Sequence, residues 1–73
     1  MSYKLTIMVP AQTPESFIQK TCKIWADVQH LPSGLTGYSW LFESSFAAGS
    51  TELCSMRELK ALVPEATSRI EEV

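Results

Sequence analysis

Apolar and polar side chains alternate at the start of the chain. The apolar positions are Tyr3, Leu5, Ile7 and Val9, and Lys4, Thr6 and Met8 separate them. Successive side chains of a β-strand point to opposite faces, so apolar residues at every second position share one face. The pattern therefore predicts a strand over residues 3–9 with one buried face.

A helical spacing of apolar residues follows this strand. Thr13 and Pro14 supply an N-cap and a first helical position. The residues with helical spacing are Phe17, Ile18, Thr21, Cys22, Ile24, Trp25, Val28 and Leu31. The sequence then continues with Pro, Ser and Gly at positions 32–34, which form a stop signal. We therefore predict a long amphipathic helix from Pro14 to Leu31 that covers a sheet.

The alternating pattern returns over residues 35–43. One face of this segment would carry Tyr38, Trp40 and Phe42, and the other face Ser39, Leu41 and Glu43. Aromatic residues at every second position are typical of a strand that packs one face against a core. The segment is therefore predicted to be a second strand.

The signals after residue 43 are mixed. The small residues from Ser44 to Ser50 predict a hairpin loop. Residues 51–54 fit either a short third strand or irregular chain. Ser55 and Glu58 have the spacing of a capping box, which predicts a second helix beginning at Met56.

The end of the chain also leaves two structures open. Pro64 either ends the second helix or begins a short new one, because proline lacks a backbone N–H and clashes with the preceding turn. The apolar anchors beyond it are Ala66, Ile70 and Val73. We predict a last helical piece over residues 65–73, with a final strand as the alternative.

The predicted elements give one α+β domain over residues 1–73. Their order, β-α-β-β-α, is that of a split β-α-β unit and resembles a truncated ferredoxin-like domain. The resemblance implies a two- or three-stranded antiparallel sheet with one long and one short helix on one face. The other face, with Met8 and Leu41, is then left for solvent, a second copy or a partner.

Composition and charge restrict the class of protein. The chain has 73 residues, 45% of them hydrophobic, which suffices for one core but lies near the lower limit for independent folding. The net charge is −2 and the six cations are scattered, so a nucleic-acid site is not expected. We find no segment with the pattern of a signal peptide or membrane span, and we expect a cytoplasmic protein without membrane contact.

Residues able to carry chemistry do not form a recognisable site. His30 follows Asp27 by one helical turn, at the expected end of the long helix, where the helix dipole alone favours a cationic histidine. Cys22 and Cys54 are expected to pack as small buried apolar groups, and with His30 and Asp27 they lack metal-site spacing. No clustered glycines form a phosphate loop. We therefore predict no catalytic residue, no metal and no cofactor.

These patterns favour a small non-enzymatic protein that binds another protein or a second copy of itself, in a regulatory or inhibitory role. The contact would use the open sheet face or the mildly acidic C-terminal half. The interface candidates are Met8, Tyr38, Trp40, Leu41 and Glu43. The resemblance implies an alternative, a dimeric ferredoxin-like barrel that binds or transforms an apolar small molecule. Its pocket candidates are His30, Tyr38 and Trp40.

Overall fold

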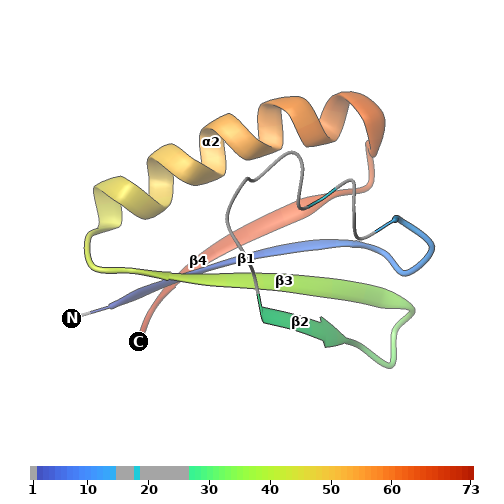
Figure 1. The fold of residues 1–73 in the computed structure, drawn as a ribbon, viewed down its shortest axis with the longest axis horizontal. Helices are drawn as coiled ribbons and strands as arrows, with labels where there is room; N and C mark the ends of the chain where they lie inside the picture. Colours follow the sequence, from blue (N-terminus) through green and yellow to red (C-terminus); the bar gives the residue numbers. More distant parts are fainter. Residues whose placement is uncertain (1, 15–17, 19–26) are drawn as a thin grey trace.

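The computed structural model describes residues 2–14, 18 and 27–73. Its elements are β1 (Tyr3–Pro10), β2 (Asp27–His30), β3 (Leu35–Phe42), α2 (Ser45–Leu62) and β4 (Thr67–Glu72). The helix α2 lies across one face of the sheet (Figure 1). The α+β class and the antiparallel sheet are therefore confirmed, but the sheet has four strands instead of two or three.

The strands form one sheet in the order β2-β3-β1-β4, and every neighbouring pair is antiparallel. β1 pairs with β3 along its whole length, from Tyr3 opposite Phe42 to Pro10 opposite Leu35. The other edge of β1 pairs with β4. β2 is short and covers only part of β3. The two central strands are the two segments with the strongest alternation, and both were predicted correctly.

The core lies between the sheet and α2. Its buried members are Leu5, Ile7, Val9, Ile18, Tyr38, Trp40, Leu59 and Ala66. Trp40 lies opposite Leu5, and Tyr38 lies opposite Ile7, so apolar side chains of both central strands share one face. Burial of this face explains why the alternation of residues 3–9 is so regular.

The predicted helix from Pro14 to Leu31 is wrong at its C-terminal end. Residues 27–30 form β2, which pairs with β3 as a hairpin. Gly34 adopts a φ of 84°, which glycine tolerates without steric cost, and the Leu31 N–H donates to the Leu35 carbonyl at 2.8 Å. The stop signal at positions 32–34 therefore marks a hairpin turn. Positions 15–17 and 19–26 of the predicted helix lie outside the described residues, and Ile18 is buried in the core.

The predicted hairpin loop over Ser44–Ser50 and the possible third strand over residues 51–54 are also wrong. Both segments belong to α2. Ser44 is the N-cap, and its Oγ accepts a hydrogen bond from the Ala47 N–H at 3.1 Å. The predicted helix start at Met56 is therefore wrong, and Ser55, predicted to cap it, instead lies buried inside α2. The small residues that indicated a loop include two alanines, which favour a helix once its first turn is capped.

The last element is the strand that was considered the alternative. α2 ends at Leu62, where the Val63 N–H donates to the Leu59 carbonyl at 2.7 Å, so Pro64 does follow the end of a helix. Residues 67–72 then form β4 rather than a last helical piece. Ser2 and Val73 continue the β1–β4 pairing, and the Val73 N–H donates to the Ser2 carbonyl at 2.8 Å. Pairing with the edge of β1 satisfies the backbone groups of this segment.

Candidate functional site

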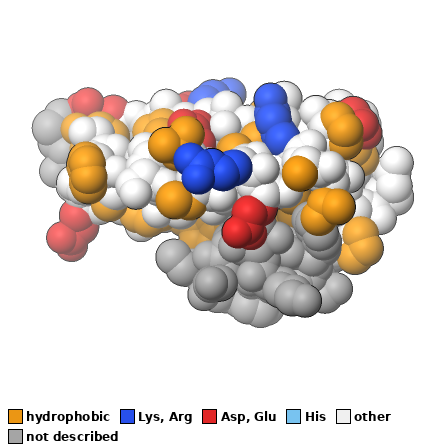
Figure 2. Space-filling view, turned by 90° about the horizontal axis from the view of Figure 1, so that it is seen from above, with side chains coloured by type: hydrophobic (Ala, Val, Ile, Leu, Met, Phe, Trp, Pro, Cys, Tyr) orange, Lys and Arg blue, Asp and Glu red, His pale blue; other side chains and the backbone are white. Residues whose placement is uncertain are grey.

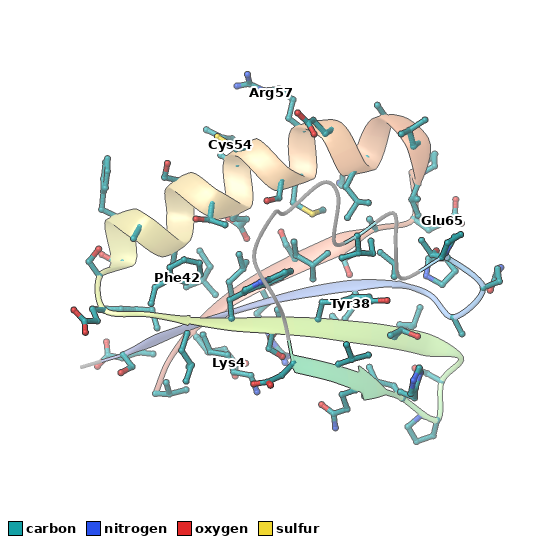
Figure 3. The ribbon with its side chains drawn as sticks, in the orientation of Figure 1. Lys4, Tyr38, Phe42, Cys54, Arg57 and Glu65 are labelled. Atoms are coloured by element: carbon teal, nitrogen blue, oxygen red, sulfur yellow. The ribbon has the colours of Figure 1, made fainter. Side chains whose placement is uncertain are left out.

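The face of the sheet opposite α2 is called the open face, because no described element covers it. Cross-strand partners lie on the same face and neighbours along a strand on opposite faces, so the register assigns its members. They are Lys4, Thr6, Met8, Gly37, Ser39, Leu41, Thr67, Arg69 and Glu71, with Asp27 and Gln29 on β2. Lys4 lies on the side of the sheet away from α2 (Figure 3).

The open face carries two apolar side chains, separated by the row that contains Thr6 and Ser39. Leu41 is 67% exposed, and Met8 is half-buried on the neighbouring strand. Gly37 lies opposite Met8, and a Cβ added to it would meet its nearest atoms only at 3.8 Å, so packing within the chain does not require glycine here.

The charges of the open face are balanced. Lys4 and Arg69 are its cations, and Asp27 and Glu71 are its anions. The Arg69 Nε lies 3.2 Å from the Glu71 Oε1, but both side chains are largely exposed, so this ion pair contributes about 0–1 kcal/mol. A face that carries both signs of charge together with exposed apolar surface fits protein contacts better than phosphate binding.

An open hollow of about 340 Å³ lies where β2 begins, at the border of the open face, and residues of both faces of the sheet line it. The residues around it are Lys4, Asp27, Val28, Gln29, Ser39, Trp40, Leu41 and Val73. Lys4 and Asp27 supply opposite charges at its rim, and Leu41 supplies exposed apolar surface. The hollow therefore suits an apolar group that carries polar atoms at its edge.

The interface candidates do not all share the open face. Met8 and Leu41 lie on it, as the alternation predicted. Tyr38 and Trp40 lie in the core with 2% and 5% exposure, because they align with Ile7 and Leu5.

Glu43, the remaining interface candidate, is exposed between β3 and the N-cap of α2. The structure thus brings Met8 and Leu41 together on one surface and separates Tyr38 and Trp40 from it.

His30 and Asp27 do not form a catalytic pair in the described structure. His30 lies opposite Thr36 and Asp27 opposite Ser39, so the two side chains leave β2 on opposite faces. The His30 Nδ1 lies 3.4 Å from the Thr36 Oγ1. The hollow on the open face includes Trp40 but neither His30 nor Tyr38, so it does not unite the three pocket candidates.

Three further observations concern metals, cysteines and membranes. Within residues 2–14, 18 and 27–73, no group of three His, Cys, Asp or Glu side chains is placed to hold a metal ion. Cys54 is a free thiol exposed on α2, which corrects the expectation that it is buried. Cys22 lies outside the described residues.

No described helix has the length and apolar character needed to cross a membrane.

Sequence reasoning missed a second apolar surface, on the side of α2 away from the sheet. Phe46 is 84% exposed and Leu53 is 64% exposed, and a hollow of about 450 Å³ lies beside them. Figure 2 looks onto the molecule from the side of α2, where hydrophobic side chains alternate with Lys and Arg. The seven-residue spacing of Phe46 and Leu53 was a usable signal, but it has meaning only for a helix.

Within the part of the chain that the structure describes, the open face and the outer side of α2 therefore each combine exposed apolar residues with a nearby hollow. The open face is the broader of the two, because residues from four strands contribute to it. Comparisons of the chain with family models, with characterised proteins and with solved structures find no match.

Proposed function

We propose that this protein is a non-enzymatic protein-binding domain that acts through the open face of its sheet, in a regulatory or inhibitory role. The observation that carries the proposal is the 67% exposure of Leu41 on a sheet face that no described element covers and that also carries Met8. Fully burying a leucine side chain contributes about 1.5–3 kcal/mol, and most of this remains available at Leu41.

The arrangement of the open face supports contact with a protein surface. Its apolar residues Leu41 and Met8 lie among Lys4, Asp27, Arg69 and Glu71, so the face offers apolar surface and both signs of charge. Specific interfaces combine apolar contacts with polar and charged groups in this way. We expect a partner that places an apolar side chain near Leu41 and opposite charges near Lys4 and Asp27.

The strand order also supports this proposal. A sheet ordered β2-β3-β1-β4 with antiparallel neighbours fits the split β-α-β arrangement of ferredoxin-like domains, and we propose that the chain adopts it. In this arrangement helices cover one face of the sheet. The other face then remains free for association.

Three leucines provide a matched test. Leu41 on the open face, Leu53 on the outer side of α2 and Leu62 at the end of α2 are 67%, 64% and 67% exposed. Each leucine is replaced by glutamine, which keeps a similar size without adding charge. Partners are captured from an extract of the source cells, and their affinities are measured by calorimetry with purified proteins.

We expect Leu41→Gln to weaken partner binding at least about tenfold, because replacing an apolar residue that an interface buries has effects of this size. Leu53→Gln and Leu62→Gln should bind as tightly as the wild type. All three variants should keep the wild-type circular dichroism spectrum, since exposed substitutions change stability little. A partner that binds Leu41→Gln with unchanged affinity would contradict the proposal.

The hollow on the open face favours a second candidate function. A second sheet placed over this face would enclose the 340 Å³ hollow beside Leu41, as in a dimeric barrel that binds an apolar small molecule. A panel of apolar compounds should then raise the melting temperature, because a ligand at 100 times its Kd stabilises a protein by about 2.7 kcal/mol. No shift with any compound would count against this candidate.

A further inference from the structure

The cross-strand register of the open face brings residues with complementary shapes and charges into the same rows. One row runs from Asp27 on β2 through Ser39 and Thr6 to Arg69 on β4. This row has an anion at one edge of the sheet, a cation at the other edge and small residues between them. The next row contains Gln29, Gly37, Met8 and Thr67.

We propose that the partner of the open face is a second copy of this chain, packed face to face about a two-fold axis that runs parallel to the strands between β1 and β3. The inference rests on the proposed function, because it uses the same surface. About this axis β1 of one copy lies over β3 of the other, and β4 lies over β2. Each residue of β1 or β3 therefore faces its own cross-strand partner in the other subunit, and each residue of β2 faces the β4 residue of the same row.

The charges of the two copies are complementary in this arrangement. Asp27 faces Arg69 of the partner subunit, and by symmetry the contact forms twice. Arg69 and Glu71 already form an ion pair within one chain, so Asp27 would join an existing cluster. An axis perpendicular to the strands would instead keep each edge strand over its own copy and bring Asp27 near Asp27 of the partner subunit. The charges therefore favour the axis parallel to the strands.

The shapes are complementary as well. Met8 faces Gly37 of the partner subunit, so a long flexible side chain meets the one position without a side chain. A Cβ added at Gly37 would be in van der Waals contact with Thr6 and Met8 of its own chain, so these side chains border the position that Met8 of the partner subunit approaches. Leu41 faces Lys4 of the partner subunit, whose hydrocarbon stem can cover it while the ammonium group stays in water.

The size of the open face sets the expected strength of the dimer. The 26 residues of the four strands, each rising about 3.3 Å on strands spaced by about 4.8 Å, give a face of roughly 400 Å² per copy. Two such faces bury on the order of 800 Å², the size of a weak, transient contact. We therefore expect a reversible dimer that dissociates on dilution, with a Kd in the micromolar to submillimolar range.

Sedimentation velocity over a wide range of concentrations tests the inference on the intact chain. The wild type should pass from monomer to dimer as the concentration rises. Leu41→Gln should weaken association at least about tenfold. Leu53→Gln and Leu62→Gln, with nearly equal exposure but off the open face, should associate like the wild type.

Charge reversal tests the register. Asp27→Arg and Arg69→Asp should each weaken the dimer, because each places like charges opposite one another, and the double variant should restore it. Lys60→Glu on α2, which removes an exposed cation away from the open face, is the control and should have no effect. Folding of each variant is checked by circular dichroism.

Each result decides between specific alternatives. A wild type that stays monomeric at submillimolar concentration would overturn the inference, but it would leave the proposed function standing if Leu41→Gln still loses a different protein partner. A dimer lost in Leu53→Gln would place the contact on α2 and overturn the inference. A dimer insensitive to both single charge reversals would overturn the proposed axis. The proposed function itself fails if neither association with a copy nor binding of another protein depends on Leu41.

Discussion

At the scale of single residues, two buried threonines of the sheet differ in the hydrogen bonding of their hydroxyl groups. Thr6 is 9% exposed, and its Oγ1 is buried without a hydrogen-bond partner among the described residues. Thr36 is buried on the opposite face, with its Oγ1 3.4 Å from the His30 Nδ1. A buried hydroxyl without a partner loses its hydration and gains nothing in return. Thr6 therefore reduces the stability of the monomer.

Replacing Thr6 with valine should raise the free energy of unfolding by about 1 kcal/mol, because it removes this desolvation penalty and keeps a β-branched side chain in a strand. Thr36→Val is the matched control and should give no such gain. Urea denaturation at low protein concentration measures both changes. A destabilised Thr6→Val variant would show that the hydroxyl group makes a favourable interaction.

At the scale of elements, one hydrogen bond at the N-cap of α2 shows that the segment after Ser44 is a helix and not a loop. The sequence pattern predicted a hairpin loop from Ser44 to Ser50, and the capping-box spacing of Ser55 and Glu58 predicted a helix that begins at Met56. The structure places the cap at Ser44, with the Ala47 N–H bound to its Oγ. The segment between the two serines is rich in small polar residues, so the local pattern did not distinguish a loop from a helix.

Ser44→Ala should lower the free energy of unfolding by about 1 kcal/mol, which is typical for loss of an N-cap. Ser55→Ala should change it by less than about 0.5 kcal/mol, because alanine has the higher helix propensity inside α2. Chemical denaturation of the two variants compares the same deletion at the cap and inside the helix. The reverse order of effects would place the start of the helix at Ser55.

At the scale of the whole molecule, stability depends on contact between two layers. A chain of this length is stable by on the order of 4–11 kcal/mol. Leu59 is fully buried and joins α2 to the core on the sheet, together with the partly buried Met56 and Val63. Few large apolar residues of α2 face the sheet, so each of them matters.

Leu59→Ala should therefore cost about 2–5 kcal/mol, the usual range for a buried leucine, and bring the protein close to unfolding at room temperature. Leu62→Ala on the same helix should cost less than about 0.5 kcal/mol, because Leu62 is 67% exposed. Thermal denaturation followed by circular dichroism gives the comparison. Equal losses at both positions would contradict the packing of α2 described here.

The sequence by itself determined the two central strands, the α+β class and the end of α2 near Pro64. Because one face of β1 and of β3 is buried against the core, apolar and polar residues alternate strictly along both strands. This alternation is visible in successive positions of the sequence. For the same reason Met8 and Leu41 could be assigned to the face away from the core before the sheet order was known. Pro64 acts through its own ring and missing N–H, which is also a local effect.

Only the tertiary structure decided the edge strands and the full length of α2. Val28 and Leu31 fit a helical spacing, and residues 65–73 carry too few apolar residues to indicate a strand. Both edge segments form strands because their backbone N–H and C=O groups can hydrogen-bond to the backbone of β3 or β1. The same pairing sets the rows of the open face, and with them the position of Asp27 level with Arg69 across the sheet. Such contacts join residues far apart in the chain, so no local pattern encodes them.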